Sequence, residues 1–173
     1  MYVLSDSTDA YIYSFLPYYG SLTTENLIRP ELPASSRIVV HLYSTLLNKL
    51  PNAEGYHIFC DRYYSSIPLA NEMLKLKCHF TGTLNRNRKF IPKFIKKPIF
   101  KNINKTVACR SNNIMLLTWK DKNIVTAIST ANDSTSCLVS RKKYDKSETI
   151  LSKPNVIVDY TKNMRGVDRA DQL

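Results

Sequence analysis

The stretch "YHIFCDRYYSSIPLANEMLKLKCHFTGTL", residues 56–84, decides the expected fold class. It predicts an apolar strand over 56–60, a helix that begins near Ser65 or Ser66, and a second strand over 79–84. Either serine can cap the helix, the proline that follows suits the first turn, and leucine and methionine recur at helical spacing. A strand–helix–strand order of this kind is typical of an α/β protein.

The residues before this stretch extend the same pattern. Residues 1–6 and 10–19 are rich in tyrosine and β-branched residues, which predicts two strands. Residues 34–50 carry apolar side chains at helical spacing, and Ser35 or Ser36 is the expected N-cap. The chain is therefore expected to form a sheet with helices crossing between its strands.

After residue 84 the pattern changes. Residues 114–119 and 124–130 predict a β-hairpin, residues 131–148 predict a polar, basic loop, and residues 154–173 predict a short strand followed by a helix. We therefore predict three parts: a core over 1–84, a basic, β-rich insertion over 85–154, and a closing strand and helix over 155–173.

The charge of the chain favours a polyanionic partner. The 173 residues include 25 Lys and Arg against 14 Asp and Glu, a formal net charge of +11. Such an excess suits nucleic acid or an acidic membrane face. No apolar run approaches the roughly 20 residues that cross a bilayer, so no membrane partner is expected. The four cysteines form no C-x-x-C pair, which argues against a zinc knuckle and gives no support for a disulfide framework.

Two groups of basic residues are candidates for contact with nucleic acid. One lies in the aromatic, basic run over 85–105, and its alternative interpretation is a solvated loop that phenylalanines hold to the core. The other lies in the predicted loop near residue 142, where a mobile loop is the simpler interpretation. The candidates are Arg86, Arg88, Lys89, Lys93, Lys96, Lys97, Arg141, Lys142 and Lys143.

Four aspartates are candidates for catalysis. Asp6 and Asp61 each follow a predicted strand, where α/β proteins place functional groups, although a turn aspartate bound by backbone amides is the alternative. Asp168 and Asp171 share one face of the predicted last helix, where stabilisation of the helix dipole is the alternative. Carboxylates brought together in a basic protein can hold Mg²⁺ for phosphodiester chemistry.

Several motifs carry a family resemblance. The segment "CDRYYSSIPLA" (60–70) and the segment "GVDRADQ" (166–172), preceded by "DYTKNM" (159–164), are the most specific. A basic "NRNRKFIP" (85–92) follows the predicted strand 79–84. On these motifs the sequence resembles piggyBac-type transposases and proteins domesticated from them, over almost its whole length.

The resemblance implies a fold, a reaction and a partner. The fold would be a ribonuclease H-like mixed sheet with flanking helices and an insertion before the last helix. The reaction would be cut-and-paste transposition of double-stranded DNA, from transposon ends to TTAA targets, with Mg²⁺ or Mn²⁺. Asp6, Asp61 and Asp168 would be the catalytic metal ligands, and Asp171 would support them. The resemblance also implies a nuclear protein that is a dimer in intact family members.

The sequence departs from the family in two ways. Arg165 stands where many relatives have glycine. Intact members also carry long N-terminal regions, and often a Cys-rich C-terminal domain, that these 173 residues do not include. Three hypotheses therefore stay open: a transposase core fragment whose activity the missing domains put in doubt, a non-catalytic DNA-binding remnant, and an unrelated basic α/β protein whose aspartates are turn and cap residues.

Overall fold

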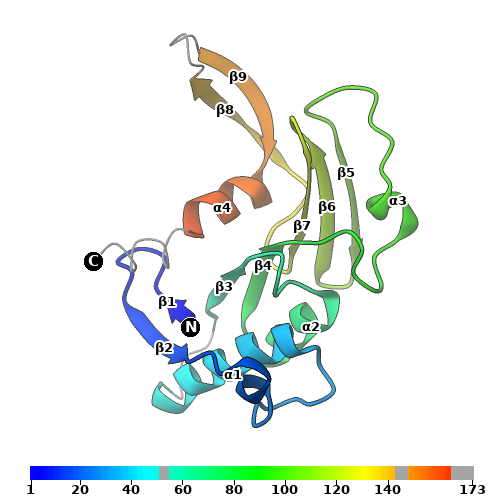
Figure 1. The fold of residues 1–173 in the computed structure, drawn as a ribbon. Coiled ribbons are helices and arrows are strands. Elements are labelled where there is room, and N and C mark those ends of the chain that lie inside the picture. Colours follow the sequence, from blue (N-terminus) through cyan, green and yellow to red (C-terminus); the bar gives the residue numbers. More distant parts are fainter. Residues whose placement is uncertain (51–54, 143–147, 165–173) are drawn as a thin grey trace.

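A computed structural model describes residues 1–50, 55–142 and 148–164. Two hairpins flank a five-stranded mixed sheet with the strand order β3-β4-β7-β6-β5 (Figure 1). The hairpins are β1 (Tyr2–Ser5) with β2 (Ile12–Leu16), and β8 (Ser136–Lys142) with β9 (Glu148–Pro154). The sheet strands are β3 (His57–Cys60), β4 (His79–Thr83), β5 (Thr106–Ser111), β6 (Ile114–Lys120) and β7 (Ile124–Ser129). The helices are η1 (Gly20–Thr24), α1 (Ala34–Lys49), α2 (Ile67–Lys75), α3 (Lys93–Lys96) and α4 (Asn155–Asn163).

The strand–helix–strand prediction is confirmed. The side chain of Ser66 accepts a hydrogen bond from the backbone N–H of Leu69 at 3.2 Å, so it caps α2. Strands β3 and β4 on either side of α2 are parallel, and Cys60 pairs with Gly82. Parallel strands require such a crossover, which explains why the capped helix lies between them.

The predicted N-cap of α1 is wrong. Pro33 occupies the N-cap position, and no side chain caps the helix there. The hydroxyl of Ser36 instead lies 3.1 Å from that of Ser66, and both serines are buried between α1 and α2. A buried hydroxyl needs a partner, and packing of the two helices supplies one that the helix end does not.

Side chains of the sheet alternate between two cores. On β6, Ile114 and Leu116 join the cluster that includes α1 and α2, whereas Met115, Leu117 and Trp119 join α4. This period of two places helices on both faces of the sheet, as expected for an α/β fold. Trp119 is 2% exposed and lies in the second of these cores. The predicted mixed α/β fold with flanking helices is confirmed as well.

The sheet is continuous across the predicted boundary at residue 84. Strand β7 pairs antiparallel with β4, so one sheet combines strands from the predicted core and the predicted insertion. The division into residues 1–84, 85–154 and 155–173 stays a prediction.

Two predictions for the C-terminal third are wrong. The predicted loop over 131–148 contains β8, which pairs with β9 from Ser136↔Pro154 to Lys142↔Glu148. The predicted short strand after Pro154 is helical, because Pro154 ends the ladder and α4 begins at the next residue. Within the described ranges, no helix combines the length and the apolar character needed to cross a membrane.

Candidate active site

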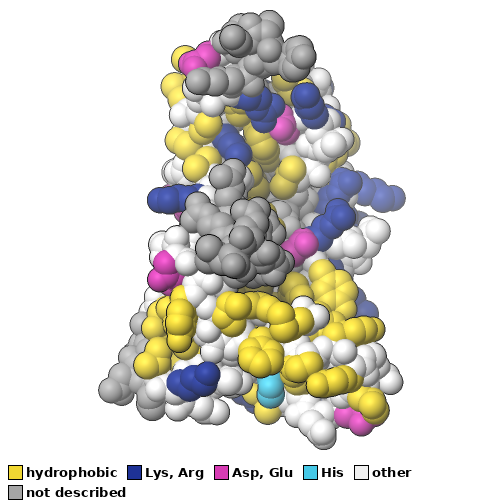
Figure 2. Space-filling view, turned by 60° about the vertical axis from the view of Figure 1, so that its left-hand side comes forward, with side chains coloured by type: hydrophobic (Ala, Val, Ile, Leu, Met, Phe, Trp, Pro, Cys, Tyr) yellow, Lys and Arg dark blue, Asp and Glu magenta, His cyan; other side chains and the backbone are white. Residues whose placement is uncertain are grey.

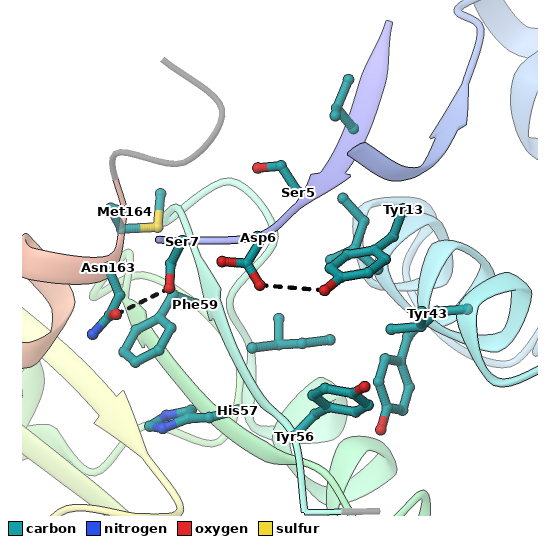
Figure 3. Close-up of a pocket in the computed structure, with 14 residues that line it drawn as sticks. Ser5, Asp6, Ser7, Tyr13, Tyr43, Tyr56, His57, Phe59, Asn163 and Met164 are labelled. Carbon is teal, nitrogen blue, oxygen red and sulfur yellow. Dashed lines mark hydrogen bonds between the residues drawn. The ribbon is translucent and has the colours of Figure 1, made fainter. Parts of the chain in front are cut away.

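Strands β1 and β3 line a common cleft. A cavity of about 270 Å³ is lined by Asp6, and a second cavity of about 470 Å³ is lined by Asp61. Both cavities share the same walls from β1 and β3 and also Met164, which caps the C-terminal end of α4. We call these two cavities the β1–β3 cleft; Figure 3 shows its Asp6 side. The structure thus places Asp6 and Asp61 just beyond the ends of two strands, and each lines one of two cavities that share residues of β1 and β3.

The carboxylate of Asp6 is held by its own turn. Oδ1 accepts hydrogen bonds from the backbone N–H of Thr8 at 2.7 Å, from the Thr8 hydroxyl, and from the N–H of Asp9 at 3.4 Å. Oδ2 accepts a bond from the Tyr13 hydroxyl at 3.3 Å. The two bonds from Thr8 are the main cause of a lowered pKa for Asp6, so this carboxylate stays ionised at neutral pH. Oδ1 of Asp6 therefore serves the turn, as the alternative interpretation predicted, while Oδ2 keeps a lone pair that could bind a cation.

Asp61 is exposed and starts the turn that leads into α2. Its backbone carbonyl accepts bonds from the N–H of Tyr64 at 3.0 Å and of Ser65 at 3.1 Å. Its Oδ1 accepts a bond from the N–H of Arg62, and its Oδ2 accepts none from any residue that the structure describes. The backbone thus makes the turn and leaves the carboxylate open to solvent.

The donors in the cleft suit a hard cation. Asp6 and Asp61 offer carboxylate oxygens, and Mg²⁺ is commonly held by one or two carboxylates together with water and substrate phosphates. Asp168 and Asp171 lie outside the described residues, as does Arg165. No group of three His, Cys, Asp or Glu side chains in the described ranges could hold a metal ion. The three-aspartate site therefore stays a prediction.

Two residues of α4 form hydrogen bonds at the end of β4 and in the turn after β1, and the sequence did not single them out. The hydroxyl of Tyr160 accepts a bond from the hydroxyl of Thr83 at 3.2 Å. Burial raises the pKa of Tyr160, and the negative charge of Asp61 acts in the same direction, so the phenol is protonated. The Oδ1 of Asn163 accepts a bond from the Ser7 hydroxyl at 3.1 Å (Figure 3). Helical spacing predicts the helix, but only its docking reveals these contacts.

A basic groove begins beside Asp61. It has a volume of about 710 Å³, and its cationic lining residues are Arg62, Arg86, Lys96 and Lys97. None of the four forms an ion pair with another described residue, so their charges are available to an anion. Arg62 is not among the residues predicted from the sequence, although its place directly after Asp61 was a usable signal.

The other predicted basic residues are not gathered in this groove. Arg88 donates to the backbone carbonyl of Tyr63 at 2.5 Å, and Lys89 and Lys93 are exposed on the same segment. On β8, the guanidinium of Arg141 donates to both carboxylate oxygens of Asp121, at 3.1 and 2.9 Å. An arginine bound in this way is less available to phosphate. The loop expected there is a strand, and the Lys142 side chain and Lys143 lie outside the description.

The β1–β2 end of the molecule is apolar outside as well as inside. Exposed aromatic and aliphatic side chains gather there, and Figure 2 shows a band of hydrophobic side chains across that end of the face. The exposed members on or next to the hairpin and η1 are Met1, Tyr11, Ile12, Phe15, Tyr18, Tyr19 and Leu22. This band is distinct from the basic groove.

Comparison with known proteins gives a consistent picture. A family model described as "Transposase IS4" matches residues 1–173. Human "PiggyBac transposable element-derived protein 3" is 28% identical over 167 residues, which cover 94% of this chain and 28% of that protein. The human "Chimeric ERCC6-PGBD3 protein" is also 28% identical over 167 residues, but these cover only 15% of its length.

A solved structure shares the fold. It is titled as a piggyBac transposase synaptic complex with hairpin DNA and superposes with a TM-score of 0.77 at 24% identity. The match covers 98% of this chain and 32% of that chain. This chain therefore spans about a third or less of the proteins that it resembles.

Proposed function

Because the chain belongs to the Transposase IS4 family, we propose that it is the catalytic-core segment of a transposase that cuts and joins double-stranded DNA. The observation that carries the proposal is the position of Asp61. Its exposed carboxylate lines the β1–β3 cleft, and the residue directly after it, Arg62, lines the basic groove. An acidic site next to a cationic track suits phosphodiester chemistry, because the track attracts the phosphates that the acids alone would repel.

Asp6, Asp61 and Asp168 would hold a divalent cation, Mg²⁺ or Mn²⁺, and Asp171 would support them. When bound, such ions activate the attacking oxygen and stabilise the leaving oxygen. The turn donors of Thr8 keep Asp6 ionised, and the hydroxyl of Tyr13 orients its Oδ2. The fold match supports a ribonuclease H-like arrangement for this core.

The proposed DNA partners are transposon ends and TTAA targets, in the nucleus and within a dimer. The names of the relatives support a transposon origin, and they also support DNA as the partner. Arg62, Arg86, Lys96 and Lys97 would contact backbone phosphates, which fix the register of DNA without reading its sequence.

A second candidate function is DNA binding without cleavage. The observation that favours it is the Asp6 turn, in which three donors from Thr8 and Asp9 occupy Oδ1. A turn of the same form occurs at Asp133, whose Oδ1 accepts from the N–H and the hydroxyl of Thr135. If the carboxylate of Asp6 serves only to stabilise its turn, as that of Asp133 does, the chain would bind DNA without a metal site at this position.

Strand cleavage separates these two functions. The substrate is a TTAA-flanked transposon end with Mg²⁺ or Mn²⁺, and the variants are Asp6→Asn, Asp61→Asn and the turn-matched control Asp133→Asn. Under the first function, the variants at 6 and 61 stop cutting and retain DNA binding, while the control still cuts. If no variant and no parent protein cuts but all bind, the second function holds.

Binding in the groove is tested through its salt dependence. Lys96→Ala with Lys97→Ala removes two groove charges, which should reduce the slope of log K against log salt by about 1.8. Lys105→Ala with Lys122→Ala makes the same change in net charge at exposed positions outside the groove lining. Equal slopes for the two double variants would rule out the groove as the DNA track.

A further inference from the structure

The two candidate ligands that the structure describes belong to separate sheets. Asp6 follows β1 in the two-stranded hairpin, and Asp61 follows β3 in the five-stranded sheet. Among the described residues, no backbone hydrogen bond joins β1 or β2 to the larger sheet. The hairpin rests on α1, where Ser14 donates to the carbonyl of Leu42 at 3.0 Å. Leu4 and Tyr13 of the hairpin also pack against the main core, and a polar contact is added at the tip of the hairpin, which carries Asp6.

Helix α4 supplies a contact at this tip. Ser7, the residue after Asp6, donates its hydroxyl to Oδ1 of Asn163 at 3.1 Å (Figure 3). The Nδ2 of Asn163 donates to the carbonyl of Asp159 at 2.9 Å, one helical turn earlier. The amide of Asn163 is therefore held on both sides, which fixes its orientation toward the hairpin.

The same turn of α4 is bound to the larger sheet. The Tyr160 hydroxyl accepts from Thr83, at the end of β4, the strand that pairs with β3. The carboxylate of Asp159 accepts from Nδ2 of Asn132 at 2.5 Å, just after β7. Three polar side chains on one helical turn thus join α4 to both sheets.

These contacts are separate from the packing of α4. The helix is held to the sheet by Val156 and Ile157, which are buried in the cluster around Trp119. That apolar contact would persist without the polar side chains of the last turn. The polar contacts therefore add orientation at the end of α4 that lies beside the β1–β3 cleft.

We propose that Asn163 and Tyr160 are positioning residues that set the separation of Asp6 from Asp61, and so the affinity of the cleft for a divalent cation. The metal part of this inference rests on the proposed function. The geometric part, that the last turn of α4 holds the hairpin against the sheet, is independent of the proposed function. Residues that orient metal ligands typically change affinity by 10–100-fold when they are removed.

A distance measurement tests the geometry without reference to activity. Phe15 on β2 and Phe94 on α3 are 62% and 51% exposed, and each can be replaced by the near-isosteric p-acetylphenylalanine and spin-labelled. We expect Asn163→Ala to shift or broaden the distance distribution between these labels. Ser7→Ala should do the same from the other end of the bond, and the double variant should add no further change, as coupled partners do.

The matched control is another asparagine of the same helix. Asn155 begins α4, and its Nδ2 donates to the Thr135 hydroxyl at 2.7 Å, in the turn before β8. Asn155→Ala should leave the distribution unchanged. If the distributions of Asn163→Ala and Ser7→Ala match that of the control, the positioning role is overturned.

Titration with Mn²⁺ tests the link to the metal. In the parent chain and in Asn155→Ala we expect equal affinity, and in Asn163→Ala and Tyr160→Phe we expect it to fall about tenfold. Tyr11→Phe, at an exposed tyrosine, is the control for Tyr160. Unchanged affinity in both α4 variants would overturn the inference. A parent that binds no Mn²⁺ would instead count against the proposed function, and the label distances would still decide the geometric part.

Discussion

Gly82 offers the sharpest test of how the strand–helix–strand unit holds Asp61. It lies in β4 opposite Cys60, next to the turn that leads into α2. A Cβ at this position would lie 2.1 Å from the hydroxyl of Ser65 and 2.7 Å from the backbone carbonyl of Cys60. Both distances are shorter than real contacts, so Gly82→Ala must displace the turn on which Asp61 sits.

The expected cost follows from three effects. Overpacking in a close-packed core costs about 1–3 kcal/mol. Displacement of Ser65 also breaks its hydroxyl bond to the Asp61 carbonyl, 3.0 Å long, for about 1 kcal/mol. Replacement of glycine by alanine also lowers the conformational entropy of the unfolded chain, which offsets about 0.4–1 kcal/mol of this loss. We therefore expect a net loss of about 1–3.5 kcal/mol in the free energy of unfolding, a drop in Tm of roughly 2–14 °C for a chain of this size.

Urea unfolding followed by the fluorescence of Trp119, the single tryptophan, measures this loss. Ser65→Ala is the partner variant, because it removes the atom at 2.1 Å and leaves the collision with Cys60. Gly82→Ala should therefore cost less in the Ser65→Ala background than in the parent. Equal stability of Gly82→Ala and the parent would refute the reasoning, as would an equal cost in both backgrounds.

Three further predictions concern stability. Burial, aided by His79, lowers the pKa of His57 to about 4, so the unfolded chain takes up its proton first as the pH falls. Stability should therefore fall by about 1–2 kcal/mol between pH 6.5 and 4 in the parent, because solvent screens part of the effect at this partly exposed ring. The fall should be smaller in His57→Gln, measured by urea unfolding at each pH. Ser66→Ala should cost about 1–2 kcal/mol through loss of the α2 cap, and Ser66→Thr, which retains the capping hydroxyl, should cost less by the same assay. The hydrogen bonds from Arg141 lower the pKa of Asp121, so this ion pair contributes about 0.5–1 kcal/mol to the free energy of unfolding above pH 4, and the contribution is lost below that pH. Asp121→Asn should remove this acid-dependent loss of stability. An acid unfolding profile like that of the parent would contradict the prediction.

The sequence was sufficient wherever the signal is local. The serine before Ile67 and the proline after it marked the start of α2, because a cap and a first turn depend only on adjacent residues. Two strand-like runs, over 114–119 and 124–130, joined by a short polar segment, marked β6 and β7. The type of each candidate ligand, and its place after a strand at Asp6 and Asp61, were also readable from the chain.

The sequence failed where an element needs a distant partner. The residues of β8 resemble a polar loop, since the strand exists only through its pairing with β9 and the face that carries Ser136, Leu138 and Ser140 stays exposed. Arg141 resembled a DNA contact until the fold placed it against Asp121. No local pattern could show that Lys96 and Lys97 line the same groove as Arg62.

By itself, then, the sequence determined the local helices and strands, the excess of positive charge and the chemical types of the candidate ligands, because these depend on neighbouring residues. Only the tertiary structure decided that β1 and β3 border the β1–β3 cleft, that Oδ1 of Asp6 is bound within its own turn, and that Tyr160 and Asn163 of α4 contact the end of β4 and the turn after β1. The physical reason is that hydrogen bonds between residues 77 and 156 positions apart form only after burial of apolar faces has docked their elements.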